Sequence, residues 1–169
     1  MADALILGAG AAGLHAVFQL GLAGLSAEVI EQGPAPGGQL ARYGSKPVHD
    51  MPGFLTVTGG EVLERLHAQA LQMKPVFHFG EKVTGWEPGF TLTCASGRTF
   101  RAPILILAGG PKYATAVNPA DCMSAQTPGL FAVGDAAAYP GKLNYLIPAF
   151  HEAALMAQKA FSLLKGKPA

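Results

Sequence analysis

The feature that most limits how this chain can fold is a glycine-rich turn, Gly8 to Gly13, with the sequence Gly-Ala-Gly-Ala-Ala-Gly. It follows Ala4–Leu7, a short apolar run typical of a buried parallel strand. It precedes Leu14–Leu22, where apolar residues recur at helical spacing, and Ala27–Glu31 then predicts a second strand. The chain therefore begins with a strand–helix–strand unit of about 30 residues, which is typical of parallel α/β sheets.

Three glycines in this turn have the spacing of a dinucleotide-binding fingerprint. Gly8 permits the tight turn, Gly10 lets a pyrophosphate approach the backbone, and Gly13 lets the helix pack close to the strand. The helix N-terminus offers free N–H groups to the phosphates. Glu31, at the end of the next strand, can accept hydrogen bonds from ribose hydroxyls and disfavours a 2′-phosphate. The alternative interpretation is a glycine-rich turn in an unrelated α/β protein.

NAD and FAD compete for such a site, and the far end of the chain separates them. Leu130–Val133 predicts another buried strand, which is followed directly by Gly134 and Asp135. In flavoproteins with two dinucleotide-binding domains, an aspartate in this position binds the ribityl chain of FAD, an interaction that NAD cannot offer. Gly-Asp after a strand is by itself an ordinary turn, but its combination with the N-terminal fingerprint favours FAD.

Several separate motifs resemble those of the thioredoxin reductase-like flavoproteins, and in particular the thioredoxin reductase-type ferredoxin–NADP reductases. The resemblance covers nearly the whole chain. The segments that carry it are Glu31 with Gly37-Gly38-Gln39-Leu40, Asp50–Phe54, Thr127–Asp135, Tyr139–Leu143 and Phe150–Ala153.

The resemblance implies a complete set of FAD contacts. Gly38–Leu40 and Asp50 are expected to line the flavin, Val83 to meet the adenine through its backbone, and Asp135 to bind the ribityl chain. Leu143 and Asn144, taken as the start of the last helix, are expected to present N–H groups to the pyrimidine edge, where a helix N-terminus stabilises a reduced flavin. The predicted site comprises Gly8, Gly10, Ala12, Gly13, Glu31, Gln32, Gly38, Gln39, Leu40, Tyr43, His49, Asp50, Val83, Ala108, Gly109, Gly134, Asp135, Lys142, Leu143 and Asn144.

Two departures from the family pattern matter. The family inserts a second, NADPH-binding domain after the strand ending near Ala108–Gly110, whereas here only seven residues, Pro111–Val117, separate Gly110 from Asn118. Because the smallest ordinary domains need about 50 residues, we expect that domain to be absent, and the CxxC of thioredoxin reductases is missing with it. His49 stands where the ferredoxin reductases usually have a tyrosine stacked on the flavin, and nearby Tyr43 is a candidate for part of that role.

The catalytic residues stay unknown at this level. His49 is a candidate for flavin stacking or proton donation, with a half-exposed loop histidine as the equal alternative. For His151–Glu152, a solvated helix face or cap is favoured over acid–base chemistry. Lys142 is expected to guard the flavin edge or to be solvated, as is Lys46. Glu64 and His67 have the spacing of half a di-iron site, but no second half follows, so we expect no metal.

Composition excludes several classes of partner. Half of the residues are hydrophobic, 14% are charged, and the net charge is +1, which is typical of a globular protein that does not bind nucleic acid. No apolar run approaches the roughly 20 residues of a membrane span, and a cytoplasmic location is expected. Cys94 and Cys122 form no CxxC and are expected to be ordinary buried or half-buried thiols. The resemblance also implies a homodimer.

We therefore expect residues 1–169 to form a single α/β, Rossmann-like FAD-binding domain, with a parallel sheet, helices on one face and a small antiparallel sheet on the other. A long loop is expected over Gly33–Gly60, a helix over Glu61–Lys74, a buried strand over Ile104–Ala108, and a last helix from near Leu146. The turns Glu87–Gly89 and Ala95–Gly97 predict the hairpins of the antiparallel sheet. The favoured function is an oxidoreductase or electron-transfer flavoprotein reduced by an external donor, either a redox protein or a diffusible molecule. The alternatives are a non-enzymatic FAD-binding module and a minimal or engineered single-domain remnant of a ferredoxin reductase-like protein.

Overall fold

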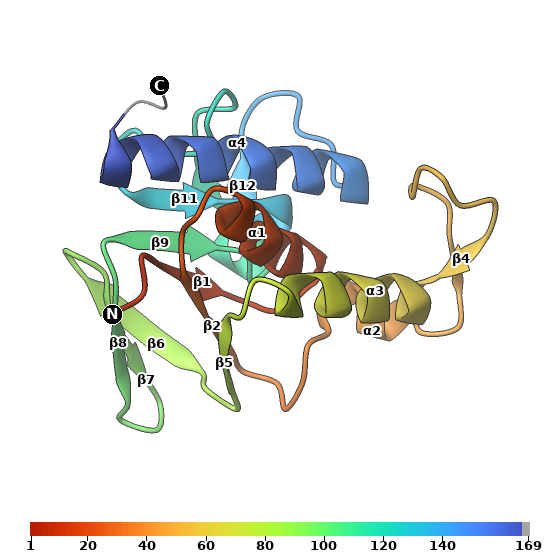
Figure 1. The fold of residues 1–169 in the computed structure, drawn as a ribbon, viewed down its shortest axis with the longest axis horizontal. Helices are drawn as coiled ribbons and strands as arrows, with labels where there is room; N and C mark the ends of the chain where they lie inside the picture. The colour runs from red at the N-terminus through yellow and green to blue at the C-terminus, as the bar shows by residue number, and fades with distance from the viewer. Residues whose placement is uncertain (167–169) are drawn as a thin grey trace.

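The computed structural model of the chain describes residues 1–166 and is built on a five-stranded sheet in the order β11-β9-β1-β2-β5 (Figure 1). All neighbouring strands in this sheet are parallel. The strands are β1 (Ala4–Leu7), β2 (Ala27–Glu31), β5 (Val76–Phe79), β9 (Ile104–Leu107) and β11 (Leu130–Ala132). The predicted strand–helix–strand unit at the N-terminus is confirmed, and it forms the centre of the sheet.

Three helices cover one face of this sheet, with α1 lying between the other two (Figure 1). They are α1 (Ala11–Leu22), α3 (Gly59–Leu71) and α4 (Leu146–Lys165). Alternate strand residues such as Ala4 and Ile6 point into the core beneath these helices. Their neighbours Leu5 and Leu7 point into a second core on the opposite face. The central strands are buried on both faces, which explains their uninterrupted apolar sequences.

A small antiparallel sheet covers the second face, as the turn-forming residues between its strands predicted. It consists of β6 (Val83–Glu87), β7 (Thr91–Cys94) and β8 (Thr99–Arg101), in that order. Phe90, Leu92 and Phe100 from this sheet pack against Leu5 and Leu105 of the parallel sheet. The predicted fold class is therefore confirmed.

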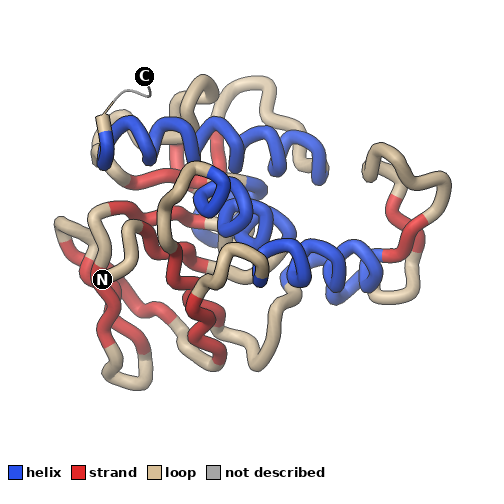
Figure 2. The backbone as a smooth tube through the Cα atoms, in the orientation of Figure 1, coloured by secondary structure: helices blue, strands red, loops and turns tan. Residues whose placement is uncertain are grey.

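The segment from Gly33 to Gly60 differs from the continuous loop that the sequence predicted. It contains the six-residue helix α2 (Gly38–Tyr43) and a hairpin of β3 (Pro47–Val48) and β4 (Val57–Thr58), which projects from the body of the molecule (Figure 2). A helix of fewer than two turns and strands of two residues are too short to produce a detectable hydrophobic period.

The starts of α3 and α4 follow from local chemistry. α3 begins at Gly59 rather than at Glu61, because Thr58 and Glu61 form a capping box across its first turn. The N–H of Thr58 donates to the Glu61 carboxylate at 2.8 Å, which lowers the pKa of that carboxyl group. α4 begins at Leu146, so that Pro148 lies in the first turn, where its missing N–H breaks no helical hydrogen bond.

The remaining elements are short. The turn η1 (Pro111–Tyr113) leads into β10 (Thr115–Ala116), which pairs in parallel with β12 (Ala137–Ala138). A second short turn, η2 (Gly134–Ala136), follows β11.

Both cysteines are buried and free, as predicted. Burial raises the pKa of the Cys122 thiol to about 12, so that it stays protonated at neutral pH. Within residues 1–166, no helix combines the length and the apolar character needed to cross a bilayer.

Candidate functional site

A cleft of about 990 Å³ opens at the carboxyl ends of the parallel strands. Its wall includes Gly8 after β1, Glu31 at the end of β2, Gly109 after β9 and Asp135 after β11. Ligands of open α/β sheets bind at this edge, in the crevice beyond the strand ends. The hairpin and α2 contribute a further wall through Tyr43, the segment 47–50 and their neighbours.

The glycine-rich turn is packed so closely that side chains are excluded at two of its positions. Gly8 has φ +108°, and a methyl group there would lie 2.8 Å from the carbonyl oxygen of Ala108. A methyl group at Gly13 would lie 2.0 Å from the carbonyl oxygen of Gly8. Gly10 differs, because a methyl group there would meet only the Cα of Gly38, at 3.6 Å, and would project toward the cleft that Gly10 lines. Gly13 is therefore required for packing, whereas Gly10 keeps space free on the ligand side.

Glu31 is held rigidly at one end of the cleft. Its Oε2 accepts the N–H of Ala9 at 2.8 Å, and its Oε1 accepts the N–H of Gly33 at 2.7 Å. Each carboxylate oxygen can accept a second hydrogen bond, so the group can still bind hydroxyls. These two backbone contacts fix its orientation, and no side-chain cation within residues 1–166 forms a salt bridge with it.

At the other end of the cleft, two hydrogen bonds each join segments that are far apart in the sequence. The amide nitrogen of Gln39, in α2, donates to Oδ2 of Asp135. The N–H of Leu146, at the first position of α4, donates to Oδ2 of Asp50 at 2.6 Å. The projecting hairpin is thus tied to the start of α4, and α2 is tied to the turn after β11.

Most of the residues predicted from the sequence meet in this cleft. Of the twenty, all but Gly13, Lys142 and Leu143 line it. His49 and Tyr43 lie on its wall as exposed side chains. Gly13 is buried under the turn, which agrees with its predicted packing role.

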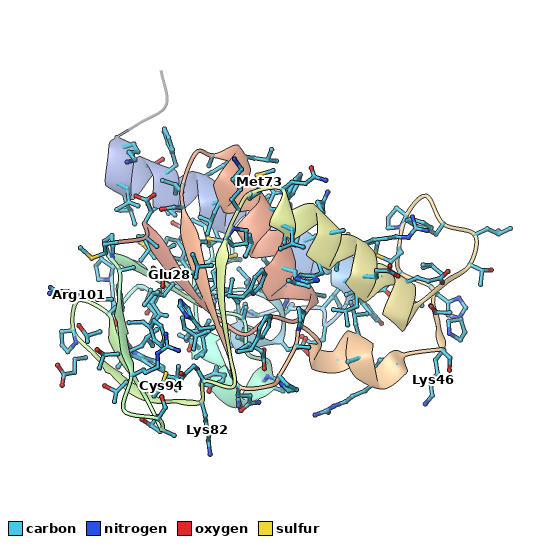
Figure 3. The ribbon with its side chains drawn as sticks, turned by 60° about the horizontal axis from the view of Figure 1, so that its bottom comes forward. Glu28, Lys46, Met73, Lys82, Cys94 and Arg101 are labelled. Atoms are coloured by element: carbon cyan, nitrogen blue, oxygen red, sulfur yellow. The ribbon has the colours of Figure 1, made fainter. Side chains whose placement is uncertain are left out.

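The predictions for residues 142–144 need correction. Leu143 and Asn144 do not begin the last helix, because α4 starts at Leu146. The side chain of Leu143 is 58% exposed and does not line the cleft, whereas Asn144 does. Lys142 neither lines the cleft nor is solvated, because its ammonium donates to the buried carboxylate of Glu152. Lys46 is also absent from the cleft wall and points away from the body of the protein (Figure 3).

Glu152 is the polar residue that the sequence interpretation misplaced. The sequence favoured a solvated helix face or a helix cap, but the side chain of Glu152 is 2% exposed. Its Oε2 accepts the N–H of Gly134 at 2.7 Å, and its Oε1 accepts the hydroxyl of Tyr139 at 2.6 Å. Burial, followed by this bond to the carboxylate, raises the pKa of Tyr139. The signal was present in the sequence, because Glu152 lies in the apolar stripe of α4 with Ala149, Ala153 and Met156.

The segment that joins Gly110 to Asn118 also contributes to the cleft, which the sequence did not predict. Lys112 donates to Oε1 of Gln32 at 3.1 Å, beside Glu31, and its ammonium lies 4.8 Å from the centre of the Tyr113 ring. Other lining residues outside the predicted set are Leu7, Ala11, Ile30, Arg42, Pro47, Val48, Glu81, Gly110, Pro111, Tyr145, Leu146 and Ala149.

The remaining histidines lie outside the cleft. His78, in β5, forms a hydrogen bond of 2.8 Å with Glu28 of the neighbouring strand β2, which is labelled in Figure 3. The ring of His15, in α1, lies 4.6 Å from that of Phe150, in α4, at an angle of 46°, and burial lowers the pKa of His15. Among residues 1–166, no three histidine, cysteine or acidic side chains gather closely enough to hold a metal ion.

Comparison with known proteins agrees with this geometry. A family model described as an NAD(P)-binding Rossmann-like domain matches residues 6–70. The chain is 42% identical over 113 residues to a ferredoxin–NADP reductase of Flavobacterium johnsoniae, covering 64% of this chain and 32% of that protein. It is 40% identical over 116 residues to one of Beijerinckia indica, covering 64% of this chain and 34% of that protein. The chain thus spans about a third of the length of these curated relatives.

Solved structures show the same fold. A thioredoxin reductase from Gloeobacter violaceus aligns with a TM-score of 0.78 and 15% identity, covering 99% of this chain and 97% of that one. The T. acidophilum thioredoxin reductase aligns with a TM-score of 0.80 and 12% identity, covering 95% and 98%. The fold is therefore Rossmann-like, with a cleft beyond the carboxyl ends of its parallel strands. In sequence the chain is similar to ferredoxin–NADP reductases, and in fold it is similar to thioredoxin reductases.

Proposed function

We propose that this chain binds FAD in the cleft and acts as an oxidoreductase whose flavin is reduced by an external donor. The observation that carries the proposal is the pairing of two sites in one cleft. The glycine-rich turn and Glu31 form one site, and Asp135 with Gln39 forms the other. The volume of about 990 Å³ lies at the upper end of the range for small-molecule clefts, about 300–1,000 Å³, which suits a ligand as large as a dinucleotide.

Glu31 is suited to bind the adenosine ribose. Its carboxylate is fixed by two backbone N–H groups and has lone pairs left to accept ribose hydroxyls. Hydrogen bonds to a charged group are worth roughly 1.5–3 kcal/mol. Glu31 therefore anchors the nucleotide end and disfavours a 2′-phosphate by charge repulsion.

The start of α1 is suited to bind the pyrophosphate. The helix begins at Ala11, and no acidic residue occurs in its first turn. The N–H groups of that turn have no helical partners, and the helix dipole favours negative charge there. Gly10 adds no side chain between this helix end and the cleft.

The other end of the cleft is suited to the ribityl chain and the ring of a flavin. Asp135 accepts one bond from Gln39 and retains acceptor capacity for hydroxyl groups. Asp50 holds the hairpin against the first turn of α4, beside Asn144 on the cleft wall. FAD, when bound, supplies the redox chemistry, while these residues bind and orient it. His49 lies on the same wall as a candidate for stacking on the ring or donating a proton to it.

The short connection between β9 and β10 indicates where the electrons come from. Between Gly110 and Asn118 the chain forms only η1 and β10, whereas a domain needs at least about 50 residues. A nicotinamide-binding domain therefore has no room at this position. Electrons then come from a separate redox protein or a diffusible donor that reaches the cleft.

Extraction of the cofactor tests the first half of the proposal. The protein is purified, or reconstituted with a mixture of FMN, FAD and NAD, and the extract is identified by mass spectrometry. FAD is the expected ligand, whereas FMN, NAD or no ligand would contradict the proposal. Turnover between dithionite-reduced and acceptor-oxidised flavin then distinguishes an oxidoreductase from a non-enzymatic FAD-binding module.

A further inference from the structure

A buried carboxylate supports the turn that carries Asp135. Glu152 projects from α4 toward η2, and its Oε2 accepts the N–H of Gly134 at 2.7 Å. The next residue along the chain is Asp135, which lines the cleft. Glu152 itself lies outside the cleft wall, so it would act on a ligand indirectly, through residues such as Asp135 that line the cleft.

The turn has little freedom to adopt another shape. Gly134 is buried with φ +62°, a conformation that favours glycine. A methyl group on it would lie 2.7 Å from the Cβ of Ala12 in α1. The turn is therefore enclosed by α1 on one side and by Glu152 of α4 on the other. A displaced Gly134 would move Asp135 away from its bond with Gln39.

Glu152 also has two side-chain partners. Tyr139 donates its hydroxyl to Oε1 at 2.6 Å, and Lys142 donates its ammonium to the same oxygen. The side chains of Lys142 and Glu152 are 9% and 2% exposed, so their charges are largely removed from water. A buried carboxylate with a cation and two further donors has its hydrogen-bonding capacity largely satisfied.

We propose that Glu152 is a positioning residue for flavin binding, which fixes Asp135 in the cleft by accepting the N–H of Gly134. Lys142 and Tyr139 have a different task, since they neutralise and solvate the buried carboxylate. The inference rests on the proposed binding of FAD. It separates one hydrogen bond, which orients the ligand-binding turn, from an ion pair, which affects only stability.

Two charge-neutral double variants separate these tasks. E152Q/K142M removes both charges but retains an amide oxygen to accept the N–H of Gly134, while its amide nitrogen can donate to the Tyr139 hydroxyl. E152A/K142M removes both charges and also the acceptor, which leaves the N–H of Gly134 without a partner. In both variants methionine replaces the aliphatic part of Lys142. The pair therefore differs chiefly in the acceptor, together with the volume of the side chain.

FAD affinity is measured by the quenching of flavin fluorescence when the apo-proteins are titrated, and thermal stability is measured on the same samples. E152Q/K142M should bind FAD within about threefold of the parent protein, and E152A/K142M should bind it at least about tenfold more weakly. At saturating FAD, the visible circular dichroism of the flavin should match the parent in the first variant and differ in the second. Equal affinities and equal spectra in the two variants would overturn the proposal.

K142M alone provides an independent test if the alanine variant fails to fold. It removes the ion pair but keeps the acceptor, so its melting temperature should fall while its FAD affinity stays within about threefold of the parent. Affinity that falls tenfold with the melting temperature would show that the cluster acts through stability only. Failure of the parent protein to bind FAD would instead reject the proposed function.

Discussion

Replacement of Gly10 by alanine tests whether the glycine-rich turn binds a dinucleotide or only completes the fold. Gly10 is the N-cap of α1, with φ −82° and ψ −172°, a conformation that alanine adopts freely. A methyl group there would have one neighbour within van der Waals distance, the Cα of Gly38 at 3.6 Å. It would therefore fit the folded protein without overlap but would occupy the side from which a pyrophosphate approaches.

The expected change in stability is small. Alanine is a poorer N-cap than glycine by about 1 kcal/mol at most, and it restricts the unfolded chain enough to return about 0.4–1 kcal/mol. The net change in unfolding free energy is therefore within about 1 kcal/mol of zero. The methyl group instead weakens FAD binding, and we expect a loss of about 1.4–2.8 kcal/mol, or tenfold to a hundredfold in affinity.

Two matched substitutions complete the experiment. G13A should lower the stability of the fold itself, because its methyl group would lie 2.0 Å from a backbone oxygen. Overpacking of this kind costs about 1–3 kcal/mol or more. G85A has no atom within 4 Å and should leave both properties unchanged. Thermal unfolding of the apo-proteins and fluorescence titration with FAD give the two readouts. G10A with unaltered FAD affinity, or with a loss of stability as large as that of G13A, would refute the reasoning.

Three further predictions follow from other contacts. E31A should weaken FAD binding by roughly 1.5–3 kcal/mol in the same titration, with E64A, on the exposed face of α3, as the unaffected control. The Cys122 pKa is raised from 9.0 to about 12 in the folded protein, so the folded state binds more protons than the unfolded state between these values. The unfolding free energy should therefore fall as pH rises from 9 toward 12, and C122A should reduce that slope in chemical denaturation. Light scattering should give about twice the monomer mass of 17.4 kDa, as the resemblance implies, and a monomer mass at micromolar concentrations would contradict it.

The sequence predicted the parts of the fold in which one physical signal was strong. The buried strands Ala4–Leu7 and Ile104–Leu107 are apolar throughout, because both faces of the sheet are covered. The hairpins of the antiparallel sheet were marked by glycine-containing turns. The same approach missed α2 and the β3–β4 hairpin, whose few residues produce no period.

The candidate site was predicted where motifs specify chemistry and missed where tertiary contacts decide it. Glu31, Asp50 and Asp135 line one cleft although they are far apart in the chain. Lys112 could not be placed from sequence, because its bond to Gln32 depends on how the short connection after β9 folds over the cleft. Glu152 was misplaced because an ionisable residue is assumed to be solvated unless its partners are known. Those partners lie in the segment before α4, in η2 and after β12.

The reduction of the bound flavin by NADH and NADPH tests the central claim most directly. The protein is reconstituted with FAD, and the loss of the flavin absorption band is followed by stopped flow against coenzyme concentration. Dithionite or light should reduce the flavin readily. Both coenzymes should react slowly, with rates that rise linearly and differ little, because the short connection between β9 and β10 holds no inserted domain that could orient the nicotinamide. A hyperbolic dependence with half-saturation below about 1 mM would reveal a nicotinamide site and contradict the account.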